Sequence, residues 1–433
     1  MSRPSWRATA ATALAIGVAL GTIGCSSDST GASGSGVSVW TTSGTESVLM
    51  TSQEQHNAEE GSVPLDVQVY ENDPYKTKLR TAISAGQGPT VFSGWGGGGL
   101  AAYVEAGEVE SLQAAFDAAP ELRDRIFPSV LAGGTIDGEI YGTPYNGVQP
   151  VVIYYNENVF ADNGVKVPET WDETMDAVAA FKAEGITPFS IGGAGRWPYL
   201  MWIAYLTDRI GGPEVFDAVV AGEEGAWEDP AIVTAASMIQ DLVEAGGFGD
   251  GFSSVDPNQG APEALVYTGR AAMQLQGAWG YSSAYLSGDP EFVEDGLGWT
   301  TFPSVEGGLG DPSNVTGNLS AFFSVSSKAD AETKKAATDW LVNGVFDDDY
   351  IDGLIGIGAV PPVSGIEDKI AAAPAADWNT FVYKTAQNAG NFQLSWDQAI
   401  SPEEAEVLLT NLEKLFLLEI TPDEFASNMN AAA

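Results

Sequence analysis

The sequence predicts an α/β protein, because strand-like and helix-like segments alternate along most of its 433 residues. Val37–Thr41 is a short apolar segment typical of a strand, and a helical stretch through Glu46–Glu59 follows it. Leu65–Tyr70 then alternates apolar and polar residues, as a strand with one buried face does. No repeat of short period interrupts this alternation.

A second helix, a third strand and a glycine run come next. Tyr75–Ala85 is predicted to be a helix with Gly86 as its C-cap, and Thr90–Phe92 to be a strand. The glycine run, residues 94–99, lacks the lysine of a phosphate-binding loop and the spacing of a dinucleotide fingerprint. We interpret it as a flexible turn that lets the backbone approach a ligand or a neighbouring segment closely.

The middle and end of the chain are rich in helices. Thr170 can cap a helix, and Glu173 three residues later completes a capping box. This helix is expected to end at Glu184 and Gly185, before a strand over Ile186–Ile191. Further helices are predicted over Ala261–Ala271, Ala329–Val345, Glu403–Leu418 and Pro422–Met429.

The charge balance limits the possible partners. The chain has 59 acidic and 18 basic residues, which gives a formal net charge of -41. A surface this acidic repels nucleic acid and anionic lipid, so we expect no nucleic-acid partner. A neutral or cationic small ligand would not be repelled.

Cysteine and histidine are too scarce to build a metal or cysteine-protease site. The sequence contains one cysteine, Cys25, and one histidine, His56. No disulfide can form within the chain, and zinc or copper sites made of these residues are excluded. We expect no metal and no cofactor.

The first 24 residues are typical of an export signal. Arg3 and Arg7 precede an apolar stretch, Ala8–Leu20, that is too short to span a bilayer. The stretch ends in Gly21-Thr22-Ile23-Gly24-Cys25, which resembles a bacterial lipobox whose cysteine is lipidated. A free thiol in a cleaved signal is the alternative.

The residues after Cys25 are expected to form a tether. Residues 26–36 are rich in serine and glycine and contain no large apolar side chain. We therefore expect residues 25–36 to hold a folded body close to the outer face of the cytoplasmic membrane.

An ordered set of segments resembles the family 1 extracellular solute-binding proteins, which include maltose-, raffinose- and xylobiose-type binders. The matching segments are Val37–Thr42, Gly86–Phe92, Tyr141–Tyr145, Tyr154–Asn156, Val159-Phe160, Pro168–Glu173, Gly269–Met273, Gly277–Trp279, Phe302-Pro303, Gly307-Gly308 and Ser324–Ser327. The first of them looks like the family's opening strand, and Thr90 replaces the aspartate that is usual in the second. Together they extend over nearly all of the chain after the tether.

This resemblance implies a periplasmic-binding-protein-like type II fold, with two α/β lobes, a hinge and a ligand cleft between the lobes. It also implies a substrate-binding lipoprotein that closes on an oligosaccharide and delivers it to the permease subunits of an ABC importer. We expect a monomer without catalytic activity. The chain should pass between lobes near Gly147–Pro150, Thr300–Ser304 and Val360–Ser364, giving lobes of residues 37–148 plus 304–362 and 149–303 plus 363–433.

A sugar cleft needs flat aromatic rings for the C–H faces of the sugar and polar side chains for its hydroxyls. The chain has 12 tryptophans, several of them among turn residues. The candidate ligand contacts are Trp40, Thr42, Asn72, Asp73, Trp95, Tyr145, Asn146, Trp197, Trp279, Asn318, Trp396 and Asp397. For each tryptophan the alternative is a place in the core.

Two other functions remain open from the sequence. An exported glycoside hydrolase would also use tryptophans, with two carboxyl groups about 5–10 Å apart, but nothing marks a catalytic acid. A binder of a polyamine or a peptide would suit the acidic surface, whereas a phosphorylated ligand would need more basic residues.

Overall fold

The computed structural model describes residues 36–433. The predicted export signal, the predicted lipidation of Cys25 and the tether up to residue 35 lie outside the described residues. Within this range, no helix is long and apolar enough to cross a membrane.

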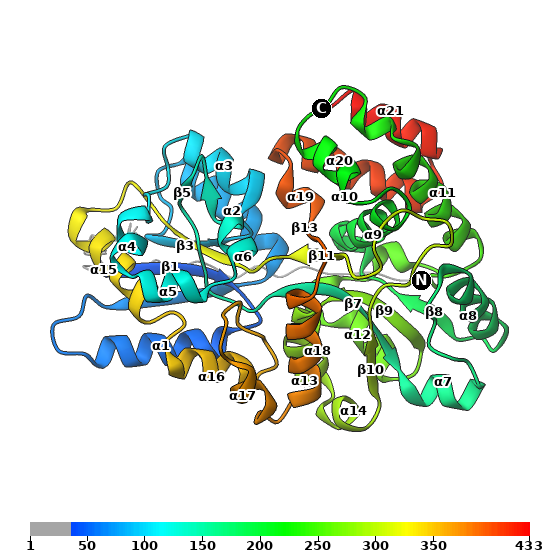
Figure 1. Cartoon of the computed structure of the whole chain (residues 1–433), viewed down its shortest axis with the longest axis horizontal. Helices are drawn as coiled ribbons and strands as arrows, with labels where there is room; N and C mark the ends of the chain where they lie inside the picture. The colour runs from blue at the N-terminus through cyan, green and yellow to red at the C-terminus, as the bar shows by residue number, and fades with distance from the viewer. Residues whose placement is uncertain (1–35) are drawn as a thin grey trace, which may run out of the picture. The chain divides into compact units, whose positions relative to one another are not determined.

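A five-stranded sheet, with the strand order β2-β1-β3-β12-β6, forms the first lobe (Figure 1). β1, β2 and β3 run parallel, whereas β12 is antiparallel to both of its neighbours. The strands are β1 Val37–Thr42, β2 Leu65–Tyr70, β3 Val91–Gly94, β6 Thr143–Pro144 and β12 Phe322–Val325, with a separate hairpin of β4 Thr135–Ile136 and β5 Glu139–Ile140. The helices are α1 Glu46–Ala58, α2 Asn72–Ser84, α3 Gly97–Glu105, α4 Gln113–Ala118, α5 Pro120–Arg125, α6 Pro128–Gly133, α15 Ala331–Asn343, α16 Asp348–Gly356 and α17 Glu367–Ala371.

Helices cover both faces of the first sheet. Val37 and Val39 of β1 pack in one core with side chains of α1, α15 and α16. Phe92 of β3 packs in another core with side chains of α2 and α3. The predicted end of α2 is confirmed: Gly86 has a φ of 67°, and the amide of Gln87 donates to the carbonyl of Ala82 at 2.8 Å, as in a Schellman motif.

The second lobe contains a six-stranded sheet with the order β13-β11-β7-β9-β8, in which β10 also pairs with β7. The strands are β7 Gln149–Asn156, β8 Thr187–Ser190, β9 Ala271–Gly277, β10 Leu297–Thr300, β11 Val315–Asn318 and β13 Phe392–Leu394. The helices are α7 Glu157–Asn163, α8 Trp171–Ala183, α9 Leu200–Gly211, α10 Pro213–Val220, α11 Pro230–Glu244, α12 Ala261–Tyr267, α13 Leu286–Gly288, α14 Pro290–Asp295, α18 Ala376–Gln387, α19 Trp396–Ala399, α20 Pro402–Phe416 and α21 Pro422–Asn430.

β7 is buried on both faces, and its two faces pack into different hydrophobic cores. Val151 and Ile153 point into a core that includes side chains of α8, α9, α11 and α20. Val152 and Tyr154 alternate with them and point into the other core, where Trp378 of α18 packs 5.4 Å from Tyr154. This two-residue period is what a strand between two helical layers requires.

The capping box predicted at the start of α8 is confirmed, with Thr170 and Glu173 bonded reciprocally. The helix predicted over Ala261–Ala271 is too long, because α12 ends at Tyr267 and β9 begins at Ala271. Gly269 has a φ of 70°, which ends the helix, and β9 is a fully buried strand next to β7.

The chain passes between the lobes three times. The first passage, between β6 and β7, overlaps the expected one at Gly147–Pro150. The second lies between β11 and β12, and so comes later than the expected passage near Thr300–Ser304. β11 belongs to the second sheet, because it pairs with β7 and β13, so residues 304–318 pack with the second lobe. Val363 forms an antiparallel bridge with Ile126 of the first lobe, and the amide of Ser364 donates to the carbonyl of Arg125 at 2.9 Å, so the first lobe continues beyond residue 362.

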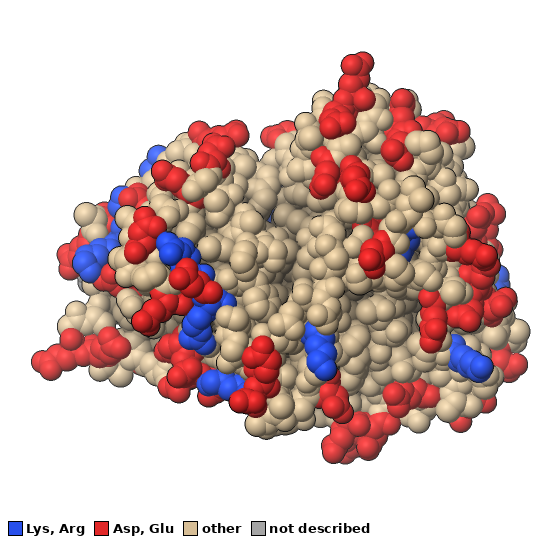
Figure 2. Space-filling view, in the orientation of Figure 1, with Lys and Arg blue, Asp and Glu red and all other residues tan. Residues whose placement is uncertain are grey.

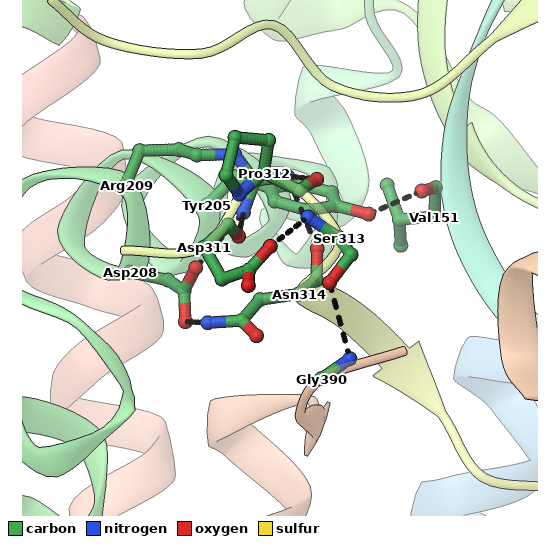
Figure 3. A network of polar contacts seen from close by, with 9 residues as sticks. All are labelled: Val151, Tyr205, Asp208, Arg209, Asp311, Pro312, Ser313, Asn314 and Gly390. Atoms are coloured by element: carbon green, nitrogen blue, oxygen red, sulfur yellow. Dashed lines mark hydrogen bonds and ion pairs between the residues drawn. The ribbon is translucent and has the colours of Figure 1, made fainter. Parts of the chain in front are cut away.

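A buried ion pair fixes the loop that precedes β11 (Figure 3). Arg209, at the end of α9, is 2% exposed and donates to Asp208 Oδ1 at 2.8 Å. The guanidinium also donates to the carbonyls of Pro312 and Asn314 at 3.2 and 3.0 Å. Asn314 Nδ2 donates to the second oxygen of Asp208 at 3.1 Å. The network holds the loop against α9 and so sets the position of β11.

Candidate functional site

A cavity of about 190 Å³ is lined by residues of both lobes. Eight of the twelve predicted ligand contacts line it: Thr42, Asn72, Trp95, Asn146, Trp197, Trp279, Asn318 and Asp397. In the view of Figure 2, the hollow between the lobes is bordered mainly by uncharged side chains, and acidic side chains gather on the outer surfaces. Two thirds of the predicted contacts therefore meet at one cavity, although they are a minority of the residues that line it.

The first lobe contributes residues at the ends of its parallel strands. Thr42 ends β1, Asn72 opens the helix after β2, and Trp95 follows β3. The carboxyl ends of parallel strands in an α/β sheet meet at one edge, where ligands bind. Lys76 Nζ lies 4.9 Å from the centroid of the Trp95 ring, a cation–π distance that helps to hold the indole in place.

The second lobe contributes two neighbouring indoles. The ring centroids of Trp197 and Trp279 lie 5.9 Å apart, with an angle of 57° between the rings. Trp197 follows Arg196, whose φ of 61° turns the chain sharply. Arg196 is held by an ion pair with Glu406 of α20 at 2.9 Å. Tertiary contacts therefore hold this turn in place.

Four predicted contacts do not line the cavity, and two of them, Trp40 and Asp73, are half-buried. Trp40 packs edge-on against Tyr70 at 5.5 Å, with Lys78 Nζ 4.5 Å from its ring centroid. Asp73 accepts a hydrogen bond at 3.0 Å from Asn258, a lining residue of the second lobe. This contact bridges the two lobes.

The other two are core residues. Tyr145 is 1% exposed, and its hydroxyl lies 2.9 Å from the hydroxyls of Thr41 and Ser93. Trp396 is fully buried, 5.3 Å from Trp227. The prediction that Trp396 and Asp397 contact ligand as a pair therefore needs correction. Successive residues of a helix point about 100° apart, so only one of the two faces the cavity.

The glycine run allows close contact between the lobes. A Cβ at Gly97 would lie 2.6 Å from the carbonyl oxygen of Gln398, and one at Gly98 would overlap the carbonyl of Ile400. Both carbonyls follow β13 in the second lobe. The interpretation that this turn lets the backbone approach a neighbouring segment is therefore confirmed.

Sequence reasoning missed several polar residues of the lining, including Glu71, Lys76, Asn258, Glu263 and Gln276. Glu263 is 2% exposed, and its Oε1 accepts from the side-chain amides of Gln274 at 2.9 Å and Gln276 at 3.1 Å. Burial raises the pKa of Glu263, although both amides oppose the shift. The sequence did contain a signal for Glu263, because it is the single acidic residue in the otherwise apolar segment 261–267.

The described part of the chain contains no group of three or more acidic, histidine or cysteine residues placed to hold a metal ion. Most of the charged side chains in the lining are acidic: Glu71, Glu263 and Asp397 against Lys76. The site is thus a mixture of indole faces, amides, hydroxyls and carboxyl groups.

The chain is similar to known solute-binding proteins. Residues 49–343 match the sequence profile of the family "Bacterial extracellular solute-binding protein". An uncharacterized ABC transporter extracellular-binding protein of Pyrococcus horikoshii is 27% identical over 219 residues, which cover 48% of this chain and 47% of the relative. The chain therefore spans about half the length of that curated relative.

Solved structures resemble the chain over almost all of its length. A structure from work on xylan utilization by the thermophilic bacterium Caldanaerobius polysaccharolyticus has a TM-score of 0.81 and 28% identity, covering 91% of this chain and 99% of its own. A chitin oligosaccharide binding protein has a TM-score of 0.79 and 24% identity, covering 91% and 97%. The two-lobe fold expected from the sequence is confirmed by these structures.

Proposed function

Because this chain belongs to the bacterial extracellular solute-binding proteins, we propose that it captures a small oligosaccharide in the cavity between its lobes. Closure of the lobes would enclose the sugar, and the closed form would deliver it to the permease of an ABC importer. Export, lipidation of Cys25 and attachment to the outer face of the cytoplasmic membrane are part of the same proposal. The protein would bind and release the sugar without chemical change.

The observation that carries the proposal is the meeting of Trp95, Trp197 and Trp279 at one cavity lined by polar side chains. The faces of indole rings suit the C–H faces of a pyranose, and the polar side chains suit its hydroxyls. The structure from work on xylan utilization and the chitin oligosaccharide binding protein are consistent with a sugar ligand. A phosphorylated ligand fits less well, since Lys76 is the one basic side chain among the described lining residues.

A polyamine is the second candidate, because Glu71, Glu263 and Asp397 outnumber Lys76 in the lining. One observation separates it from a sugar. Trp197 Nε1 is buried and has no acceptor among the described protein groups. A hydroxyl can accept from this N–H, whereas a protonated amine can only donate. This favours the sugar.

Calorimetric titration tests the proposal directly. The panel contains diacetylchitobiose, xylobiose, maltose and stachyose, with spermidine for the second candidate. We expect one sugar to bind and Trp279→Ala to raise its Kd about tenfold or more, because a stacking face is lost.

Trp40→Ala is the matched control, since Trp40 is a half-buried tryptophan outside the cavity. It should leave the Kd within about threefold of wild type, about 0.7 kcal/mol. Unchanged affinity in Trp279→Ala would remove the stacking role. Binding of spermidine and of no sugar would replace the proposal by the second candidate.

A further inference from the structure

Glu263 is a buried carboxyl group without a cationic partner. It is 2% exposed, and within residues 36–433 it takes part in none of the ion pairs. Acidic side chains are almost never fully buried unless they are paired. An acid that is buried but not ion-paired at a cavity wall needs an explanation beyond packing.

The short helix that carries Glu263 is fixed at both ends. Ser190 Oγ, at the end of β8, donates to the carbonyl of Pro262 at 2.7 Å. Asn156 Nδ2, at the end of β7, donates to the carbonyl of Val266 at 2.8 Å. Two strands of the second sheet thus set the direction in which the Glu263 side chain points.

The two glutamines beside Glu263 are oriented so that both donate to it. Gln274 and Gln276 are two residues apart on β9 and therefore share a face. The amide N–H of Gly277 can only donate, and it bonds to Gln276 Oε1 at 3.0 Å. The hydroxyl of Tyr285 donates to Gln274 Oε1 at 2.7 Å. Each glutamine therefore turns its NH₂ group toward Glu263 Oε1.

The second carboxyl oxygen of Glu263, Oε2, receives no hydrogen bond from the described residues in this arrangement. Within residues 36–433, Oε2 has no hydrogen-bond partner, and both Glu263 and Gln276 line the cavity. A buried carboxylate oxygen without a partner costs free energy that a ligand hydroxyl could offset. Asn318 Oδ1, at the end of β11, is a second lining acceptor in the same condition.

We propose that Glu263 Oε2 accepts a hydrogen bond from one hydroxyl of the bound sugar, and that this contact selects sugars carrying that hydroxyl. The inference rests on the proposed function and names a specificity-determining residue for it. A buried site built to bond a hydroxyl rejects an analogue that lacks the hydroxyl, because its acceptor is then left unpaired. Trp197 Nε1 supplies the complementary donor in the same cavity.

The test combines a protein change with a ligand change. The parent ligand is the one of diacetylchitobiose, xylobiose, maltose and stachyose that binds wild type most tightly. A series of analogues is made from it, and in each analogue a different hydroxyl is replaced by fluorine. Fluorine cannot donate a hydrogen bond. At one position we expect wild type to lose about 10- to 100-fold in affinity, the size of a hydrogen bond to a charged group. Glu263→Gln should bind the parent sugar more weakly and lose less than about threefold at that position.

Two further variants keep the result interpretable. Asp208→Asn also changes a buried carboxyl to an amide, but away from the cavity lining, and it should keep the wild-type pattern of losses. Glu263→Asp retains the charge but withdraws the acceptor by one methylene, and it should behave as Glu263→Gln does.

Equal losses in wild type and Glu263→Gln at every fluorinated position would overturn the inference and leave the proposed function standing. If none of the four sugars binds wild type, the proposed function itself fails, and the inference fails with it.

Discussion

The second lobe buries two carboxyl groups that are treated differently by their surroundings. Asp208 is 4% exposed and Glu263 is 2% exposed, and burial raises the pKa of both. At Asp208 the main opposing group is the guanidinium of Arg209, whereas at Glu263 it is a pair of amides. Only Glu263 lines the cavity.

This difference shows that a buried polar group can either stabilise the fold or remain available to bind a ligand. Both oxygens of Asp208 are bonded, and Arg209 also donates to loop carbonyls (Figure 3). One oxygen of Glu263 has no partner in the described protein. A network whose charges are paired fixes a loop, and one that leaves a single acceptor at a cavity wall is suited to a ligand.

The largest expected effect comes from breaking the paired network. Arg209→Met leaves Asp208 buried without its counter-charge and strips the carbonyls of Pro312 and Asn314 of their donor. We expect the free energy of unfolding to fall by about 3–5 kcal/mol, measured by denaturant titration at pH 7. A loss below about 1 kcal/mol would show that the pair is not structural.

A smaller effect is expected from matched amide substitutions at the two carboxyl groups. Asp208→Asn removes the charge but leaves Arg209 its carbonyl acceptors, so stability should fall by about 1–3 kcal/mol. Glu263→Gln removes an unpaired buried carboxyl, so stability should stay within about 1 kcal/mol of wild type or rise. The comparison of the two sites breaks down if Glu263→Gln is the more destabilised of the two.

The smallest effect is a change in the pH dependence of stability. The pKa of Glu263 is raised in the folded state, so the folded protein binds this proton more tightly than the unfolded chain does. Wild type should therefore lose stability relative to Glu263→Gln as pH rises from the unfolded value of about 4.3, until the folded pKa is passed.

Other ionisable groups near Glu263 do not account for this difference in pH dependence. Burial raises the pKa values of Tyr154 and Tyr285 well above 10.0, so both stay neutral in this pH range. Glu71 and Asp397 are present in both proteins and cancel in the difference. Denaturant titrations of wild type and Glu263→Gln between pH 4 and 8 would provide the comparison. A constant difference across that range would contradict the assignment of a raised pKa.

Local patterns predicted local structure well. The strand Leu65–Tyr70 has the predicted bounds, and the capping box of Thr170 and Glu173 forms as expected. Such features depend on residues only a few positions apart, so their physics is contained in the sequence. The helix predicted over Ala261–Ala271 failed because its last residue pairs as a strand with distant parts of the chain.

The candidate site was predicted less completely, for the same reason. Trp197 follows a glycine-rich turn and Trp279 lies in a segment that resembles the family, and both line the cavity. Trp396 was selected because it stands beside Asp397, but it packs against Trp227 instead. Glu263 gave little signal, because its meaning depends on Gln274 and Gln276, which the sheet places beside it.

By itself, the sequence determined the α/β class, the approximate bounds of the elements that it predicted, the acidic surface and, through ordered segments, the solute-binding family. Only the tertiary structure decided which side chains meet. Each lobe contributes one wall of the cavity, and the chain crosses between lobes at the β6–β7 and β11–β12 connections and once more between Ser364 and α18. Whether a buried polar group is fully bonded depends on packing rather than on any local pattern. Asp208, for example, is bonded by its neighbour Arg209 and by Asn314, which is more than a hundred positions away.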